Sequence, residues 1–363
     1  MVSKITCRNY FESEGPAWQG LLRYIHLPIR STNYYLTGKY TNNFQTMNNK
    51  PHNSLNFFRT DANDSHLYQH LYLRGNFRQE MFFDKVDMIN VWNRLWLSAE
   101  ATGTQILSAE ILNNHFHLTG IFRDEDHRTR FKRHFRLSIT QYHNRRYEVS
   151  GTLGTRTLKH AELKDLDDIK DCICYHLRNV LHHGITTDYL DYPYSTARYV
   201  FDLASADQQG FYTRETLPPN LASAYLPARV QMPKGWIMTR EGLIVPPDSI
   251  FRKDLVEELF GGSSDNYLET LSHRTSRESD DTGPEDGFRT DANHSRLYDE
   301  QIVEFVKENC RVPIPSMSEG QKMAAIHQIV EQFPRANRRL LSRLFGIPPT
   351  TLAYRLKTSH KRE

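Results

Sequence analysis

The feature that most constrains the fold is a pair of alternating apolar segments that meet at Asn113 and Asn114. Residues 104–122, TQILSAEILNNHFHLTGIF, alternate on both sides of these asparagines, which predicts two strands joined by a turn. Residues 67–75, LYQHLYLRG, alternate in the same way and predict a third strand. The sequence therefore predicts a β-sheet in this part of the chain.

Segments with helical periodicity lie between and after these strands. Apolar residues recur at helical spacing over 84–103. Residues 124–147 place acidic residues in the first turn and seven Lys or Arg after them, an order that suits the helix dipole. A short strand is expected near 155–163, and residues 165–183 predict a helix that ends before Gly184. We expect an α+β fold, an antiparallel sheet with flanking helices.

Length and composition indicate a soluble globular protein. The 363 residues suffice for about two domains, and 19 Tyr, 19 Phe and 4 Trp supply apolar mass for a core. No segment approaches the roughly 18 uninterrupted apolar residues of a membrane span, and the N-terminus lacks the apolar core of a signal peptide. Four cysteines supply neither a disulfide framework nor paired zinc knuckles. We expect no membrane partner and a cytoplasmic, nucleoid-associated location.

Charge and composition divide the chain into segments. The net charge is only +3, but residues 321–363 carry nine Lys or Arg against two Glu. Residues 261–287 carry seven acidic residues against two Arg and are rich in Ser and Gly, as in a mobile linker. The expected parts are an N-terminal extension (1–66), the α+β domain (67–200), a helical and loop appendage (201–260), an acidic linker (261–287) and a small all-α domain (288–363).

One internal repeat stands apart from this organisation. Residues 58–68, FRTDANDSHLY, recur at 288–298 as FRTDANHSRLY, with nine of eleven positions identical. A duplicated turn and helix start, in which Asp, Asn and Ser cap the next element, is a simpler explanation than a binding function. A single copy at each place argues against a solenoid.

Two groups of residues could carry chemistry. His115 and His117 are two apart on a predicted strand, so both imidazoles project from one face and form a pair of metal ligands. The alternative is a partly buried strand whose histidines are satisfied by hydrogen bonds. Tyr175 and Asn179 are four apart on a predicted helix and share a face, although a Tyr at helical spacing is more often a core residue.

Together these motifs resemble the single-tyrosine HUH transposases, and within them the REP-associated tyrosine transposases. NNHFHL resembles that family's His-hydrophobic-His strand, and YHLRNVLHHGI resembles its tyrosine helix. TQYHNRRYEVSG resembles the end of its basic arm, and DYPYSTARY the stretch that usually closes the domain. The resemblance covers about 68–199, a little over a third of the chain, and implies a ferredoxin-like HUH nuclease fold.

The chain departs from the family pattern in two places. The family commonly has Pro directly after the helix Asn, whereas this chain has Val180, which leaves the helix less sharply broken but removes no catalytic group. LLRYIHLPIR near the N-terminus superficially resembles the tyrosine phrase. Tyr24, however, precedes the histidine strand and lacks an Asn four residues later, so Tyr175 is the better candidate.

The resemblance implies a metal-dependent reaction on DNA. His115 and His117, with Asn179 as third ligand, would hold one divalent metal ion, for which Mg²⁺ or Mn²⁺ is expected. Tyr175 would attack the scissile phosphate, become joined to the 5′ phosphate and free a 3′ hydroxyl, so that a later hydroxyl can reseal the strand without ATP. Single-stranded or hairpin DNA suits such a site better than a stacked duplex. The predicted function is cleavage and rejoining of single-stranded DNA at repeated hairpin elements.

Two basic segments are predicted to contact DNA. On the basic helix the candidates for phosphate contacts are Arg128, Arg130, Lys132, Arg133 and Arg136, although a run of charge is usually a solvated face. Near the C-terminus three helices are predicted, with a tight turn at Gly346, and GIPPTTLAYRLK resembles a helix-turn-helix of the Fis type. Its recognition helix would meet duplex DNA through Thr350, Thr351, Tyr354 and Arg355. The alternative is a small helical dimerisation or packing module.

Two rival functions stay open at this point. In a non-catalytic DNA-binding regulator the histidines and Tyr175 would be relics or core residues. A metal-dependent phosphodiesterase would use water as the nucleophile instead of the tyrosine. Covalent capture of DNA separates the three, because only the transposase-like enzyme leaves DNA attached to protein. The chain is expected to act as a monomer or a homodimer.

Overall fold

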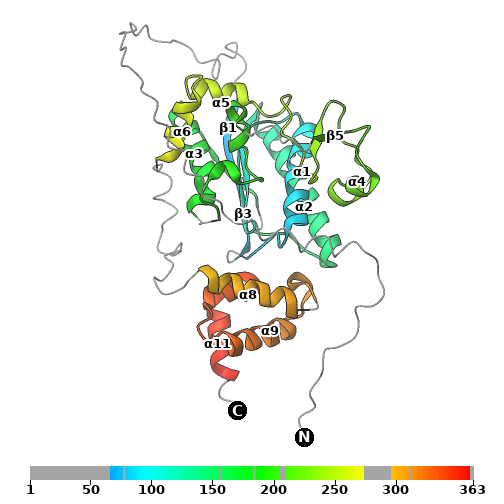
Figure 1. The fold of residues 1–363 in the computed structure, drawn as a ribbon, viewed down its shortest axis with the longest axis vertical. Coiled ribbons are helices and arrows are strands. Elements are labelled where there is room, and N and C mark those ends of the chain that lie inside the picture. Colours follow the sequence, from blue (N-terminus) through cyan, green and yellow to red (C-terminus); the bar gives the residue numbers. More distant parts are fainter. Residues whose placement is uncertain are drawn as a thin grey trace. The chain divides into compact units, whose positions relative to one another are not determined.

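The computed structural model describes residues 66–76, 79–155, 157–182, 185–203, 210–273, 296–310 and 312–359 (Figure 1). The buried apolar side chains of these residues form two separate cores. One lies within residues 68–271 and the other within residues 302–352. The first core belongs to a mixed α and β domain and the second to a small helical module.

A four-stranded antiparallel sheet is the centre of the first domain. Its strands are β1 (Leu67–Arg74), β2 (Gln105–Ile111), β3 (His115–Phe122) and β4 (Lys159–Glu162). Their order across the sheet is β2-β3-β1-β4, and all three pairings are antiparallel. The turn between β2 and β3 is closed by the amide of Leu112, which donates to the carbonyl of His115 at 2.8 Å. The predicted strands and their turn are confirmed.

Three helices flank this sheet, and side-chain caps fix where two of them begin. In α1 (Lys85–Thr102) the carboxylate of Asp84 accepts from the amide of Asp87, and in α2 (Glu125–Tyr147) Asp124 accepts from His127. Gly103 ends α1 with φ of 71°, a conformation that favours glycine. The third helix is α3 (Leu166–His182). No helix in the described part of the chain combines the length and apolar character needed to cross a membrane.

The two faces of the sheet differ in chemistry. Figure 1 shows α1 and α2 on one side of the sheet and α3 on the other. On the first side the packing is apolar, with the rings of Phe116 and Phe135 5.1 Å apart and those of Phe122 and Phe131 5.8 Å apart. The side toward α3 carries the alternate residues of each strand, many of them polar. The α+β prediction is confirmed, and the histidines of β3 belong to the polar side.

The described residues within 189–203 and 210–259 form short elements that pack onto this domain. They are the 3₁₀ helices η3 (Tyr189–Asp191) and η4 (Ala197–Asp202), the strands β5 (Phe211–Thr213) and β6 (Ile237–Thr239), and the helices α4 (Pro219–Tyr225) and α5 (Lys253–Leu259). Their apolar residues join the first core instead of building another. Hydrogen bonds anchor them to α1, since the indole of Trp92 donates to the carbonyl of Ile244 at 2.8 Å.

The expectation of a linker from residue 261 onward is wrong for its first part. Ser264–Ser272 form a helix, α6, capped by the side chain of Ser263. Tyr267 and Leu271 of this helix are fully buried, and the hydroxyl of Tyr267 donates to the carbonyl of Ala197 at 3.1 Å. Tyr267 and Leu271 are four residues apart and lie on one face of the helix. Their burial stabilises this helix despite the Ser and Gly residues around it. Residues 1–65, 274–295 and most of both repeat copies lie outside the described residues.

The C-terminal module is entirely helical. It comprises α8 (Arg296–Asn309), η5 (Ile314–Ser316), α9 (Glu319–Gln332), α10 (Arg338–Phe345) and α11 (Pro349–Ser359). Ser318 and Gln321 form a capping box at the start of α9. Gly346, with φ of 64°, makes the turn from α10 to α11. The three helices predicted after residue 318 are confirmed.

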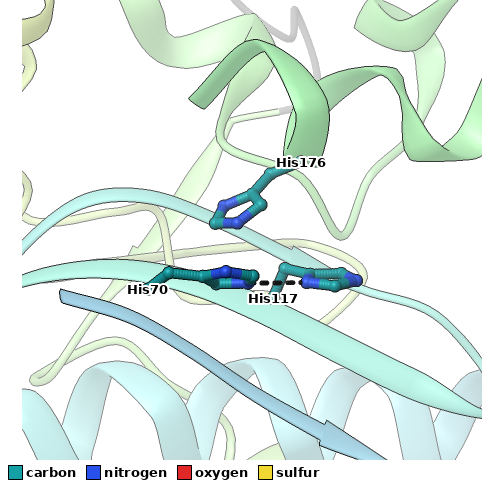
Figure 2. Close-up of side chains that lie close together, drawn as sticks. All are labelled: His70, His117 and His176. Atoms are coloured by element: carbon teal, nitrogen blue, oxygen red, sulfur yellow. Dashed lines mark hydrogen bonds between the residues drawn. The ribbon is translucent and has the colours of Figure 1, made fainter. Parts of the chain in front are cut away.

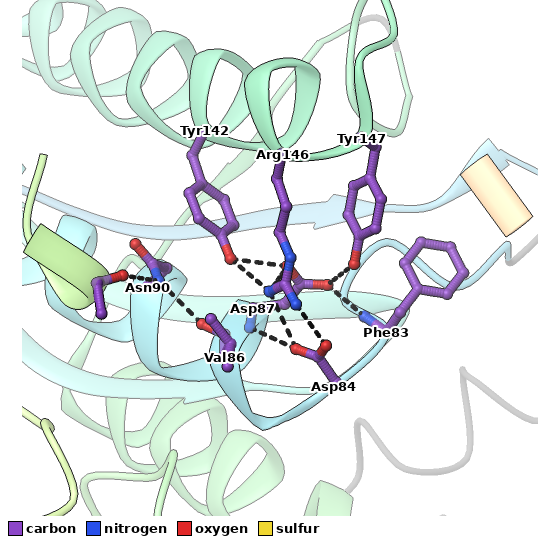
Figure 3. A network of polar contacts seen from close by, with 9 residues as sticks. Phe83, Asp84, Val86, Asp87, Asn90, Tyr142, Arg146 and Tyr147 are labelled. Atoms are coloured by element: carbon purple, nitrogen blue, oxygen red, sulfur yellow. Dashed lines mark hydrogen bonds and ion pairs between the residues drawn. The ribbon is translucent and has the colours of Figure 1, made fainter. Parts of the chain in front are cut away.

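A buried carboxylate ties α1 to α2 in the first domain (Figure 3). Asp87 is 1% exposed and accepts hydrogen bonds from the amide of Phe83, the hydroxyls of Tyr142 and Tyr147 and the guanidinium of Arg146, at 2.6 to 2.8 Å. Arg146 also pairs with Asp84. Four donors on one carboxylate compensate the loss of its hydration, so the network can be buried without a large penalty.

Removing this carboxylate is expected to destabilise the domain strongly. Asp87→Ala leaves Arg146 and two tyrosine hydroxyls without their shared acceptor, which typically costs about 3–5 kcal/mol. Glu100→Ala, an exposed change on the same helix, is expected to stay within about 0.5 kcal/mol. Chemical denaturation followed by circular dichroism measures both free energies of unfolding. Similar values for the two variants would contradict a structural role for the network.

Candidate functional site

Strand β3 presents His115 and His117 to the side of the sheet covered by α3. His117 pairs with Tyr72 of β1 and Glu110 of β2, and His115 pairs with Arg74 of β1. Directly paired residues of antiparallel strands share a face, so these side chains project to the same side. Both histidines are buried, with exposed fractions of 6% and 3%. The predicted pair of imidazoles is therefore present on one face of the strand.

Helix α3 adds the other two predicted residues to this place. The rings of Tyr175 and His117 meet edge to face with their centroids 5.3 Å apart. The amide nitrogen of Asn179 lies 3.2 Å from Nε2 of His115. Tyr175 and Asn179 are both buried side chains. Residues about 60 positions apart in the sequence thus meet in one cluster.

Hydrogen bonds engage the Nδ1 atoms of both histidines. Nδ1 of His115 lies 2.6 Å from Oδ1 of Asn114, and Nδ1 of His117 lies 2.9 Å from Nε2 of His70. With the proton on Nδ1, the Nε2 lone pair of His117 is left for a ligand, whereas that of His115 faces the amide nitrogen of Asn179. An outer partner that fixes the tautomer in this way is typical of metal-binding histidines.

Two buried atoms of this cluster fit a metal ion. Nε2 of His117 and Oδ1 of Asn179 have no hydrogen-bond partner among the described residues. Burial, together with the neighbouring His176, His115 and His70 and the charge of Arg74, holds the pKa of His117 well below its usual value of 6.5. A neutral imidazole is the form that binds metals. A cation would supply the partner that Nε2 of His117 lacks, and Oδ1 of Asn179 could join it once the amide of Asn179 is turned.

His70 and His176 belong to the cluster although the sequence did not single them out (Figure 2). The ring of His176 lies 4.5 Å from that of His70 and 5.0 Å from that of His117, between centroids. The three buried histidines offer nitrogen atoms within 4.8 Å of one another and could hold a metal ion. The alternation of β1 puts His70 on a definite face, but the sequence does not show that this face is the one under α3.

Hydrogen bonds occupy both ring nitrogens of His176 and one ring nitrogen each of His70 and His117. Nδ1 of His176 lies 3.1 Å from Oγ of Ser108, and its Nε2 lies 3.2 Å from Sγ of Cys172. His70 and His117 use one nitrogen each on their mutual contact. An ion bound by all three would have to replace these bonds, whereas Nε2 of His117 has none to lose. The geometry therefore favours His70 as the partner that orients His117.

Glu110 is a further residue that sequence analysis missed. It lies on β2 opposite His117, is fully buried, and neither carboxylate oxygen has a hydrogen-bond partner among the described residues. Burial raises its pKa well above the usual 4.5, so the acid is favoured in the absence of a cation. In the sequence Glu110 lies among the apolar residues of SAEIL, as a residue of an ordinary strand would. Only the pairing of β2 with β3 brings it beside the histidines.

Basic groups lie on β1 and β4 near this cluster. Arg74 shares its strand face with His115 and lowers the pKa of His117 through its charge. Lys159 of β4 places its ammonium 5.8 Å from the ring centre of Tyr72, which in turn lies 6.2 Å from the ring of His117. Two cations beside the histidine cluster make an environment suited to a phosphate group.

The basic helix α2 does not border this cluster, because it packs on the opposite face of the sheet. Arg128 is 8% exposed and donates to Oε1 of Gln69 at 3.3 Å, so its side chain offers little surface to a DNA phosphate. Lys132 contacts Nδ1 of His160, and Arg136 donates to the carbonyl of Thr155. Among the five predicted residues, those with exposed side chains are Arg130 and Arg133.

The predicted recognition helix α11 presents a different set of side chains. Tyr354 is 69% exposed and Thr350 is also exposed, whereas Thr351 is half-buried. Arg355 pairs with Glu319 of α9 at 2.5 Å. Tyr354 and Thr350 are thus accessible to a partner, and Arg355 would first have to leave its carboxylate.

Comparison with known proteins gives partial similarity to solved structures. No family model matches the sequence, and no curated protein does. Among solved structures the chain is similar to a REP-associated tyrosine transposase bound to a REP hairpin. The two chains are 13% identical, and the match covers 47% of this chain and 88% of the other with a TM-score of 0.30. A score of this size does not establish a common fold, so the chemistry of the cluster rests on its own residues.

We expect His117 to be required for metal binding. His117→Ala removes the unpartnered Nε2 and is expected to weaken Mn²⁺ binding at least about tenfold, while His70→Ala should cost about 10–100-fold through loss of orientation. His134→Ala, an exposed histidine on α2, serves as the matched control. Titration of free Mn²⁺ by electron paramagnetic resonance measures the affinities. Equal affinities for His117→Ala and His134→Ala would show that the cluster holds no ion.

Proposed function

We propose that this chain is a metal-dependent enzyme that cleaves and rejoins single-stranded DNA through a covalent phosphotyrosine, as its resemblance to the REP-associated tyrosine transposases implies. The observation that supports this most is the meeting of four side chains from two elements: His115, His117, Tyr175 and Asn179. The sequence motifs predict this set, and spacing within each motif does not by itself require the two motifs to meet.

In this proposal His115, His117 and Asn179 hold a divalent ion, Mg²⁺ or Mn²⁺. Two imidazole nitrogens and one amide oxygen form such a donor set when the amide of Asn179 is turned to direct its oxygen inward. Glu110, with two unpartnered oxygens on the adjacent strand, is a further oxygen donor for the same ion. When bound, the ion polarises the scissile phosphate and neutralises its charge.

Tyr175 is the proposed nucleophile. Its hydroxyl oxygen forms a bond to the phosphorus and its proton passes to water or a nearby base, while the bond from phosphorus to the 3′ oxygen breaks and that oxygen takes up a proton. The DNA remains joined to the protein through a 5′ phosphate. A 3′ hydroxyl can later attack the same phosphorus and release the tyrosine, so the strand is resealed without another energy source.

The DNA partner proposed for this site is single-stranded or hairpin DNA. Arg74 and Lys159 lie on the strands beside the cluster and suit the phosphates of a strand that approaches it. The C-terminal module would bind duplex DNA through α11, whose exposed residues include Tyr354 and Thr350. Cleavage at repeated hairpin elements is the specific activity that the resemblance implies.

Two other functions are the alternatives. A metal-dependent phosphodiesterase would share the ion but use water, leaving Tyr175 without a chemical role. A non-catalytic DNA-binding regulator would need neither the metal ion nor the tyrosine. The unpartnered atoms of His117 and Asn179 favour the two metal-dependent functions, because a purely structural core normally pairs its buried polar atoms.

Covalent capture tests the nucleophile. Tyr175→Phe is expected to fold and bind DNA but to form no protein–DNA adduct, because the ring lacks the attacking oxygen. Tyr24→Phe is the control at the other tyrosine with a similar motif. A denaturing gel with labelled hairpin oligonucleotides and Mn²⁺ detects the adduct, and excess EDTA is expected to abolish it. An adduct that persists in Tyr175→Phe would rule out this residue.

A salt series tests the C-terminal module. A chain that ends at Gly287 is expected to keep single-turnover cleavage of hairpin DNA at saturation but to bind duplex-flanked targets more weakly. Each lost phosphate contact should reduce the slope of log affinity against log salt by roughly 0.9. Tyr354→Ala in the full chain should weaken duplex binding without affecting cleavage. Unchanged slopes would make residues 288–363 a packing or dimerisation element.

A further inference from the structure

A second candidate site lies on the other side of the sheet, among α1, α2 and α4. It is a pocket of about 420 Å³, within the range of small-molecule sites. Four arginines line it, and no acidic residue does: Arg94, Arg145, Arg146 and Arg229. A pocket with this lining has a strongly positive potential and selects an anion.

Arg94 is the buried part of this charge. It is 8% exposed, lies over the ring of Tyr142 at 4.9 Å and donates to the neutral hydroxyl of Ser138 at 3.2 Å. Its Nε has no hydrogen-bond partner, and the described residues offer it no ion pair. Burial lowers its pKa to about 10, helped by the charge of Arg145. A buried guanidinium without a carboxylate is unfavourable unless a ligand supplies the anion.

The charges of the pocket are not neutralised by the neighbouring network. Arg146 is the exception, since it is paired with Asp84 and Asp87 (Figure 3). Arg145 and Arg229 have exposed side chains and, among the described residues, no carboxylate partner. Three guanidinium groups therefore remain for a ligand. Guanidinium forks match the oxygen geometry of phosphate, and several together suit a group with more than one negative charge.

The α4 side of the pocket adds apolar residues beside Arg229. These residues come from the end of α4 and the loop that follows, and include Leu226, Pro227 and Val230, the last of which is 42% exposed. Apolar side chains beside cationic ones offer the two properties that a nucleotide recognises, contact for the base and charge for the phosphate.

We propose that this pocket binds a nucleotide phosphate, either within a single-stranded DNA segment or in a free nucleotide. The choice of DNA as one source rests on the proposed function, but the binding itself needs neither Tyr175 nor a metal ion. If a DNA strand is the source, the pocket holds part of the substrate on the face of the sheet away from the histidine cluster, and the contact acts on affinity rather than on the chemical step.

Charge reversal at the two exposed arginines tests the proposal. Arg145→Glu and Arg229→Glu are each expected to weaken binding about tenfold, equivalent to about 1.4 kcal/mol. Lys234→Glu makes the same change of charge at an exposed residue that does not line the pocket. Fluorescence anisotropy of the full chain in EDTA, with a labelled single-stranded oligonucleotide and with labelled dAMP in separate arms, measures the affinities. For the oligonucleotide the salt slope should also fall by roughly 0.7 per lost contact.

The two probes distinguish the sources. Loss confined to the oligonucleotide supports a strand phosphodiester, loss confined to dAMP supports a free nucleotide, and loss in both arms supports a site for either. Unchanged binding in both arms, or an equal loss in Lys234→Glu, overturns the proposal. If Tyr175 forms no adduct with DNA, the outcome of this binding experiment is unaffected, because binding is measured without cleavage.

Arg94→Met provides a second measurement that does not depend on the exposed residues. Methionine keeps the apolar stem and removes the buried charge, so this variant is expected to melt at the same or a higher temperature than the wild type. Added dAMP should raise the melting temperature of the wild type but not of Arg94→Met. An equal rise in both proteins would show that Arg94 does not face the ligand.

Discussion

The polar face of the sheet is the feature on which the rest of the first domain depends. A sheet whose two faces were both apolar would accept α3 in several rotations, because apolar contacts are not directional. Here His176 of α3 must meet Ser108 and Thr119 of the sheet at hydrogen-bond distance. Buried polar groups left without partners are costly, so this requirement fixes the rotation of the helix. Tyr175 and Asn179, on neighbouring positions of the same helix, are thereby directed to the histidines of β3.

The cost of burying polar groups without partners also indicates where the domain could bind ligands. Most buried polar groups are paired, as the four donors on Asp87 illustrate. The exceptions include His117, Asn179 and Glu110 on one side of the sheet and Arg94 on the other. The first three are metal-binding groups in a common cluster, and the last is a cation in a pocket of arginines. Each group lacks a partner of the kind that its proposed ligand would provide.

Some expectations depended on how helices pack against the rest of the protein, and a local sequence pattern does not contain this information. The charges of α2 gave no indication that Arg128 is buried against Gln69, since burial depends on how the helix lies on the sheet. Composition placed a linker over residues where Tyr267 and Leu271 are buried, because two apolar anchors suffice to dock a short helix. Conversely, the strands and long helices were predictable, since alternation, helical spacing and caps act within a few residues.

The sequence by itself determined the strands, the long helices, the turn at Asn113 and Asn114, and the fact that His115 and His117 share a face of their strand. It also put Tyr175 and Asn179 on one face of a helix. These properties follow from backbone periodicity, which is local. Only the tertiary structure decided that those two faces meet and that His70, His176 and Glu110 join them. It also gathers in one pocket three arginines that have no carboxylate partner among the described residues. Strand pairing and helix packing set these contacts, and both depend on residues far apart in the chain.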